Sequence, residues 1–342
     1  MTHWMGKNQS MATPHHTTPY KAIDLFAGIG GIRLGFKKAF GDALEFVFAS
    51  EIDKFARQTY AANFNDMPHG DITCIDAHSI PAHDILLAGF PCQAFSVAGH
   101  RKGFEDTRGT LFFEIARIAA HHRPKMIFLE NVKGFKNHDG GKTFSVVKQT
   151  LETLGYRVFA KVLNAKEYGV PQNRERIYIV CFLNPACDFA FPTPLKKEVN
   201  VSHILEEKVD KKYTLSDRLW AGHQKRKQAH KEKGNGFGFS LFDGTSPYTS
   251  TISARYYKDG SEILIAQQGQ NPRKLTPREA ARLQGFGDEF NIVVSDTQAY
   301  KQFGNSVAVP VVASIAVLVR SVLEGLEEGK KPASCAFEKL AG

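Results

Sequence analysis

Short apolar runs alternate with longer amphipathic stretches over the first half of the chain. The runs include KAIDLF (21–26), LEFVFAS (44–50), DILLAGF (84–90), KMIFLEN (125–131) and RIYIV (176–180). Residues 111–120 and 143–154 carry apolar side chains at helical spacing, and Gly155 closes the second stretch. Strand-length runs that alternate with helices predict an α/β domain with a mainly parallel sheet.

The pattern changes over residues 185–272, where Pro, Gly, Lys and aromatic residues become frequent and helical periodicity fades. Regular patterning returns at Thr276, which forms a capping box with Glu279 and predicts a helix start. A Val- and Ala-rich stretch, 307–323, predicts a helix that packs back on the large domain. We therefore expect a mobile tail (1–20), a large domain (21–184), an inserted smaller domain (185–272), a return to the large domain (273–330) and a C-terminal tail (331–342).

Composition narrows the possible partners and compartments. The net charge of the 342 residues is +9, which favours an anionic partner, with nucleic acid ahead of a membrane surface. The longest apolar run, 307–319, is interrupted by Pro310 and stopped by Arg320, so it is too short to span a bilayer. No apolar signal-peptide core opens the sequence, and we expect a cytoplasmic protein without membrane contact.

The five cysteines, at positions 74, 92, 181, 187 and 335, include no CxxC pair. This spacing argues against a disulfide framework and against a structural metal site, and it suits a reducing compartment.

Chemically useful residues follow four of the apolar runs. A glycine loop, AGIGG (27–31), follows the first, Glu51 the second, Cys92 the third and Glu130 the fourth. In an open parallel sheet, ligands bind at the carboxyl ends of the strands. We therefore expect these groups to line one edge and to form a single site.

The glycine loop indicates an adenosine cofactor. Its G-x-G-G spacing differs from the GxGxxG of dinucleotide-binding proteins, which favours S-adenosylmethionine, a cofactor without a pyrophosphate. Glu51, 20 residues beyond Gly31, is placed to accept both ribose hydroxyls. Asp71 would hydrogen-bond the adenine amino group, or it would simply cap a turn.

Three residue types suggest nucleophilic chemistry beside this cofactor. Cys92 lies in a polar, basic loop that would expose its thiol and favour the thiolate nucleophile; the alternative is a buried, inert cysteine. Glu130 would act as an acid with a raised pKa, or it would be a solvated carboxylate. Arg174 and Arg176 would reach the same edge if the strand after them runs antiparallel, unless they form surface ion pairs.

Six motifs in order resemble those of the bacterial DNA (cytosine-5) methyltransferases, over residues 22–323. They are DLFAGIGG (24–31), GFPCQAFSVAG (89–99), ENV (130–132), QNRER (172–176), LTPREAARLQGF (275–286) and QFGNSVAVPV (302–311). The resemblance implies a Rossmann-like mixed sheet of the S-adenosylmethionine-dependent methyltransferases, with a target recognition domain inserted before the last helices. Within that insertion, KGNGFG (233–238) and STISARYYKDGSEILI (250–265) are similar to the Dcm-like subgroup, which recognises short palindromes with GG and CC at the ends.

The resemblance also implies a reaction and its residues. A methyl group would move from S-adenosylmethionine to carbon 5 of a flipped-out cytosine through a covalent bond between Cys92 and carbon 6, leaving S-adenosylhomocysteine and using no metal. The implied catalytic residues are Cys92, Glu130, Asn131, Arg174 and Arg176. The implied cofactor-binding residues are Phe26, Ala27, Gly28, Gly30, Gly31, Glu51, Ile52, Asp71, Ile72, Phe90, Pro91, Asn305 and Ser306. The implied DNA-binding residues are Gln93, Ser96, Arg108, Thr251 and Arg255.

The family setting implies a monomer in the bacterial cytoplasm that acts on double-stranded DNA. A cognate restriction endonuclease encoded nearby is the usual companion, without direct contact. Three alternatives stay open at this point: a tRNA cytosine-5 methyltransferase of the same fold, an NAD-dependent oxidoreductase and a non-catalytic DNA-binding protein.

Overall fold

Six strands form the sheet that carries the site. The structure, a computed structural model, describes residues 18–91, 111–195, 198–236 and 238–328. The strands are β1 (Tyr20–Leu25), β2 (Leu44–Ser50), β3 (Ile85–Gly89), β4 (Met126–Val132), β5 (Arg157–Asn164) and β6 (Glu175–Phe182). Their order is β2-β1-β3-β4-β6-β5; β1 to β4 run parallel, and β6 runs antiparallel to both of its neighbours. The predicted mixed, mainly parallel sheet is confirmed.

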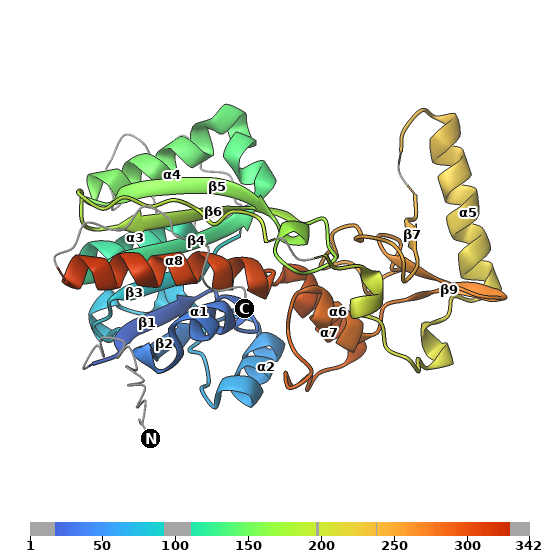
Figure 1. The fold of residues 1–342 in the computed structure, drawn as a ribbon, viewed down its shortest axis with the longest axis horizontal. Helices are drawn as coiled ribbons and strands as arrows, with labels where there is room; N and C mark the ends of the chain where they lie inside the picture. Colours follow the sequence, from blue (N-terminus) through green and yellow to red (C-terminus); the bar gives the residue numbers. More distant parts are fainter. Residues whose placement is uncertain (1–17, 92–110, 196–197, 237, 329–342) are drawn as a thin grey trace, which may run out of the picture.

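Helices cover both faces of this sheet (Figure 1). They are α1 (Gly31–Phe40), α3 (Leu111–His122), α4 (Lys142–Thr153) and α8 (Val309–Glu327); α2 (Lys54–Phe64) follows β2 and packs Ala56 into a different core. Alternate strand residues point to opposite cores, as the pleat requires: Leu87 packs on the side of α1 and α8, and Leu86 packs on the side of α3 and α4. Gly35 lets α8 approach α1, because a Cβ there would lie 2.6 Å from Cγ1 of Val312.

The last helices agree with the sequence-based prediction. Thr276 and Glu279 form both hydrogen bonds of the capping box, and α6 (Pro277–Leu283) begins immediately after Thr276. α7 (Asp296–Asn305) and α8 follow, separated by a short turn. The stretch Asp296–Glu327 is the one part of the described chain long and apolar enough to cross a membrane; most of its apolar window is buried inside the molecule, as in the core helix of a globular protein.

The region before α6 extends away from the large sheet (Figure 1). It contains α5 (Asp217–Glu232) and a small sheet of order β7-β8-β9, formed by β7 (Leu241–Phe242), β8 (Leu264–Gln267) and β9 (Gln270–Lys274). A third core, which includes Tyr256, Leu275 and Phe303, joins this region to α6 and α7. We call residues 198–275 the recognition region. Its 16-residue helix differs from the irregular chain that the fading periodicity predicted.

Short 3-10 helices complete the connections. They are η1 (Gly41–Ala43), η2 (Ile72–Cys74), η3 (Ala77–Ser79), η6 (Lys133–Gly141), η7 (Ala165–Glu167), η8 (Val201–His203) and η9 (Lys211–Tyr213).

Candidate active site

A cavity of about 730 Å³ lies at the carboxyl edge of the sheet, a volume typical of small-molecule sites. It brings together most of the residues predicted from the sequence: Phe26, Ala27, Gly28, Gly31, Glu51, Ile52, Asp71, Ile72, Phe90, Pro91, Glu130, Asn131, Arg174, Arg176, Arg255, Asn305 and Ser306. Gly30 and Thr251 do not line it. Cys92, Gln93, Ser96 and Arg108 lie outside the described residues.

The glycine loop between β1 and α1 has a backbone that side chains would obstruct. Gly30 has φ +82°, and a Cβ there would collide with the ring of Phe64. A Cβ on Gly31 would lie 2.6 Å from Oγ of Ser306, so this position also lets the turn before α8 come close. No side chain caps α1. The amide groups of its first turn are therefore suited to bind an anionic group.

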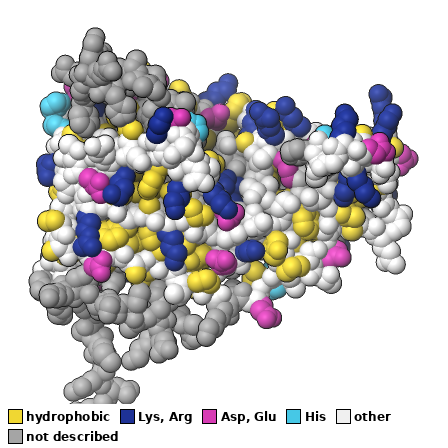
Figure 2. All heavy atoms as spheres, turned by 90° about the horizontal axis from the view of Figure 1, so that it is seen from above, with side chains coloured by type: hydrophobic (Ala, Val, Ile, Leu, Met, Phe, Trp, Pro, Cys, Tyr) yellow, Lys and Arg dark blue, Asp and Glu magenta, His cyan; other side chains and the backbone are white. Residues whose placement is uncertain are grey.

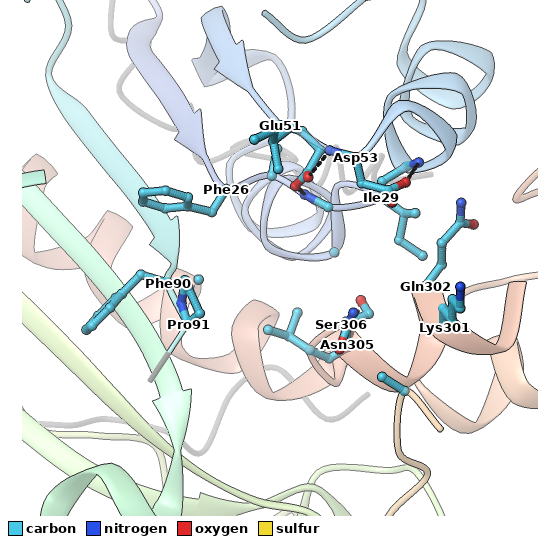
Figure 3. Close-up of a pocket in the computed structure, with 18 of the residues that line it drawn as sticks. Phe26, Ile29, Glu51, Asp53, Phe90, Pro91, Lys301, Gln302, Asn305 and Ser306 are labelled. Atoms are coloured by element: carbon cyan, nitrogen blue, oxygen red, sulfur yellow. Dashed lines mark hydrogen bonds between the residues drawn. The ribbon is translucent and has the colours of Figure 1, made fainter. Parts of the chain in front are cut away.

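Two carboxylates line the cavity on the side of this loop. Glu51 accepts backbone hydrogen bonds from Gly28 (2.7 Å) and Asp53 (2.8 Å), which fix its orientation at the end of β2. Figure 3 shows Glu51 across the cavity from Phe90 and Pro91. Asp71 caps η2 by accepting the amide of Thr73 at 3.0 Å, and it also lines the cavity. The turn cap is confirmed, and the hydrogen bond from Asp71 to an adenine amino group stays a prediction.

One face of α7 completes the wall; the sequence analysis singled out Asn305 on it and missed the other three residues. Its residues are spaced three and four apart, which is the signal that could have identified them: Gln298, Lys301, Gln302 and Asn305. Gln302 is 8% exposed, and its Oε1 accepts a hydrogen bond from Thr59. Its Nε2 has no hydrogen-bond partner among the residues that the structure describes. A buried amide without a partner in a cavity wall suits a polar ligand group.

Glu130 and Arg176 form a largely buried ion pair in the cavity wall. Nε of Arg176 lies 3.2 Å from Oε1 of Glu130. The antiparallel pairing of β4 with β6 sets Arg176 opposite Val132, two residues along β4 from Glu130, which confirms that the start of β6 reaches this edge. Burial raises the pKa of the Glu130 carboxyl, although the charges of Arg176 and Arg174 lower it. This favours a carboxyl group that can hold a proton at the site.

Asn131 fixes the chain just before the cysteine loop. Its Nδ2 donates to the carbonyl of Phe90 at 2.8 Å, and its Oδ1 accepts the amide of Val132. Phe90 is two residues before Cys92 in the sequence. Asn131 therefore holds β3 and β4 together where the loop with Cys92 begins.

Arg174 is buried and contacts backbone rather than solvent. Its guanidinium donates to the carbonyls of Ile252 (3.1 Å), Gly304 (3.1 Å) and Ser306 (2.6 Å). Gln172, two residues earlier, accepts the amide of Ile252 and donates to the carbonyl of Leu283. The sequence analysis did not single out Gln172, although it opens the QNRER motif. These two residues tie the recognition region to the cavity wall.

The two recognition candidates differ in their surroundings. The hydroxyl of Thr251 donates to the carbonyl of Asn173 at 2.6 Å, so it supports the backbone. Arg255 is exposed and lines the cavity. The role of both residues in reading bases stays a prediction.

The polar and apolar groups of the cavity fit an adenosyl amino acid. Glu51 offers oriented acceptors for a ribose diol, and Phe26, Ile52 and Phe90 offer apolar surface for an adenine ring. The start of α1 and the amide of Gln302 offer donors for a carboxylate. Within the residues that the structure describes, no group of three or more His, Cys, Asp or Glu side chains could hold a metal ion.

Comparisons with known proteins agree with this arrangement. Residues 20–319 match the family described as C-5 cytosine-specific DNA methylase. The Dnmt2 methyltransferase of S. pombe has the same fold, with a TM-score of 0.73 at 23% identity, over 88% of this chain and 98% of that one. The expected methyltransferase fold is thereby confirmed.

Two bacterial proteins are much more similar in sequence. The type II methyltransferase M1.ScrFI of Lactococcus lactis subsp. cremoris is 60% identical over 319 residues, 92% of this chain and 81% of the relative. The type II methyltransferase M.NlaX of Neisseria lactamica is 58% identical over 312 residues, 91% of this chain and 99% of the relative. With its family match over residues 20–319 and these relatives, the chain belongs to the C-5 cytosine-specific DNA methylases.

Proposed function

We propose that this DNA cytosine-5 methyltransferase is the modification enzyme of a type II restriction–modification system. It methylates one cytosine within a short palindromic duplex site. Two relatives at 58% and 60% identity are named type II methyltransferases, which supports the proposal and favours DNA over tRNA as substrate. The protein works as a monomer in the bacterial cytoplasm, and a restriction endonuclease encoded nearby cuts the unmodified site.

The observation that carries the proposal is the Glu130–Arg176 pair beside an adenosyl-sized cavity. A glycine loop and Glu51 line the same cavity, so a reacting base and an adenosyl cofactor would meet there. S-adenosylmethionine, when bound, supplies an electrophilic methyl group. The remaining chemistry belongs to the chain, and no metal is required.

Cys92 is the nucleophile. Carbon 5 of cytosine is a poor nucleophile until a thiolate adds to carbon 6 and breaks the conjugation of the ring. The sulfur of Cys92 forms that bond, and carbon 5 gains the electron density needed to accept a methyl group. A general base then takes the proton from carbon 5, and the electron pair of that bond forms the double bond to carbon 6 and expels the Cys92 thiolate, which restores the ring. Carbon 6 is out of reach inside a stacked duplex, so the base is flipped out.

Glu130 and Arg176 hold the flipped base during this addition. The carboxyl of Glu130, whose pKa burial raises, donates a proton or a hydrogen bond to ring N3 and neutralises charge as the adduct forms. Arg176 donates to the ring carbonyl. Asn131 is a positioning residue, because it holds the carbonyl of Phe90 at the entry to the cysteine loop. Arg174 is likewise a positioning residue, because its hydrogen bonds go to backbone carbonyls.

The inserted domain over residues 185–272 reads the flanking bases. Its KGNGFG and STISARYYKDGSEILI segments support membership of the Dcm-like subgroup. Arg255, which lines the cavity, contacts a base or a phosphate, and Gln93, Ser96 and Arg108 also contact the DNA. Thr251 supports the segment that carries Arg255.

Bisulfite sequencing of a random-sequence duplex library tests this function. The library is incubated with the protein and S-adenosylmethionine, and Cys92→Ala serves as the matched control. We expect protected cytosines within one short motif, and only with intact Cys92. If no cytosine is protected in DNA while the same assay on tRNA gives protection, the DNA assignment is wrong.

A further inference from the structure

α5 is a long helix that buries almost nothing. Of its 16 residues, His223 alone is buried. The helix lies in the part of the recognition region farthest from the large sheet (Figure 1). A helix that is polar on nearly every side gains little stability from packing in a core. Its exposed side chains therefore point to another role, such as binding a partner. Figure 2, which looks down on the molecule, shows Lys and Arg side chains projecting from the end that carries this helix.

The inner face of α5 is anchored to the rest of the recognition region. Trp220 packs edge-on against Phe239, with ring centroids 4.7 Å apart. Lys227 lies over the same ring at 4.2 Å, and Arg226 forms an ion pair with Asp259 at 3.0 Å. Two of the cations in the KRK run are therefore engaged within the protein. The anchoring fixes the direction in which the outer face points.

The outer face presents two other cations. Arg218 and Lys225 are seven residues apart, so they lie on one side of the helix, about 10 Å from each other along the axis and turned away from His223. Both are exposed, and within the described part of the chain neither forms an ion pair. Between them lie Ala221 and Gly222, which leave the surface smooth enough for close approach.

We propose that this outer face of α5 contacts the sugar–phosphate backbone of duplex DNA beside the recognition site. The inference rests on the proposed function, because it requires a duplex DNA substrate. Arg218 and Lys225, which form no ion pair within the described residues, complement phosphates over the first two turns of this face, and Glu232, seven residues beyond Lys225, limits its cationic part to these turns. The face carries no set of amide side chains for reading base edges, so its contacts position the duplex without choosing its sequence. Lys225 therefore differs in role from Arg226 and Lys227, whose side chains contact Asp259 and Phe239 on the inner face.

The test is the salt dependence of DNA binding by the full chain. Affinity is measured by fluorescence anisotropy on two duplexes, one with the methylation site found by bisulfite sequencing and one without it, over a series of salt concentrations. For Arg218→Gln/Lys225→Gln we expect the slope of log affinity against log salt to become shallower by about 2, since each phosphate contact contributes roughly 0.9. Affinity at low salt should fall on both duplexes alike, and turnover at saturating DNA should be unchanged.

The matched control removes the same charge elsewhere. Lys38→Gln/Lys142→Gln neutralises two exposed lysines, one on α1 and one at the start of α4. A slope that is unchanged in the α5 variant, or that changes equally in the control, overturns the inference, as does a loss confined to the duplex with the site. If wild-type protein methylates DNA while the α5 variant keeps its slope, only the role of α5 is wrong. If wild-type protein neither binds nor methylates duplex DNA, the proposed function falls as well.

Discussion

Glu130 illustrates how a single position acquires its chemistry. It follows four apolar residues in β4, and the sheet buries it to 9% exposure beside two arginines. Burial disfavours the charged carboxylate, and the Arg176 guanidinium at 3.2 Å favours it. The raised pKa means that burial outweighs the arginines in the free protein. If the flipped cytosine accepts a proton from Glu130, the carboxylate that remains is stabilised by its ion pair with Arg176.

Asp24 is a second buried acid, beneath the glycine loop. It is fully buried at the end of β1, and the hydroxyl of Tyr60 donates to its Oδ2 at 3.4 Å. Within the described part of the chain, its Oδ1 has no hydrogen-bond partner. Burial raises the pKa of the Asp24 carboxyl to about 8, although Arg33 and Tyr60 lower it. The sequence analysis did not single out this residue because Asp24 lies inside the run KAIDLF, whereas Glu51 and Glu130 were selected because they follow apolar runs.

Replacing Asp24 should change how stability depends on pH. The unfolded carboxyl ionises near its ordinary pKa of 3.8, whereas the folded carboxyl keeps its proton to about pH 8. The unfolded state therefore binds fewer protons over this range, and wild-type stability falls as pH rises. Asp24→Asn has no carboxyl to ionise, so its stability does not fall with pH in this way. The difference in free energy of unfolding between the variant and wild type should therefore increase in favour of the variant, by up to about 1.4 kcal/mol per pH unit between roughly pH 4 and 8. Urea unfolding of both proteins across this range measures it; a constant difference would contradict the raised pKa.

Elements with one clear hydrophobic face were predictable, and those without one were not. α3, α4 and α8 place apolar side chains at helical spacing because each covers a face of the sheet. β5 was missed because it is an edge strand whose Arg157 and Lys161 stay exposed among apolar residues. α5 was missed because it packs through few side chains. Its helical form rests on composition and on the Ser216 cap rather than on periodicity.

Site residues were predictable where they directly follow a strand in the sequence. Glu51 and Glu130 each follow an apolar run, so the rule for parallel sheets placed them correctly at one edge. Gln302 could not be placed in the same way. Its position depends on α7 crossing back to α2, where Thr59 donates to it, and this contact joins residues 243 positions apart.

The start of α6 offers a graded test of local structure. Thr276 caps the helix, and Glu279 pairs in the interior with Arg273 at 2.7 Å. Thr276→Ala removes one cap and should cost about 1 kcal/mol of unfolding free energy. Arg273→Met leaves the buried Glu279 without its cation and should cost about 3–5 kcal/mol. Chemical denaturation of both variants compares the two costs. Equal losses would mean that the ion pair adds nothing beyond the cap.

At the scale of the whole molecule, the large sheet and the recognition region share a small buried junction. Residues 172–174 lie immediately before β6. Their side chains form hydrogen bonds with Ile252 in the recognition region and with the turn between α7 and α8. The walls of the cavity come from all three segments. A cofactor and a DNA base bound in this cavity would therefore contact the large sheet, the recognition region and the turn between α7 and α8. The buried junction fixes the positions of these three segments relative to one another.

The relative position of these segments should depend on Arg174. Arg174→Lys keeps the charge, but a single ammonium cannot serve the carbonyls of Ile252, Gly304 and Ser306 together. Leaving one or two of them unpaired should lower stability by about 2–4 kcal/mol. Hydrogen exchange followed by mass spectrometry should then quicken both around residue 252 and around residues 304–306. Gln172→Leu is the matched control, because it releases Ile252 and Leu283 but leaves the turn before α8 in place. Faster exchange in only one of the two segments of Arg174→Lys would mean that the guanidinium supports them separately, and that the register is set by the third core instead.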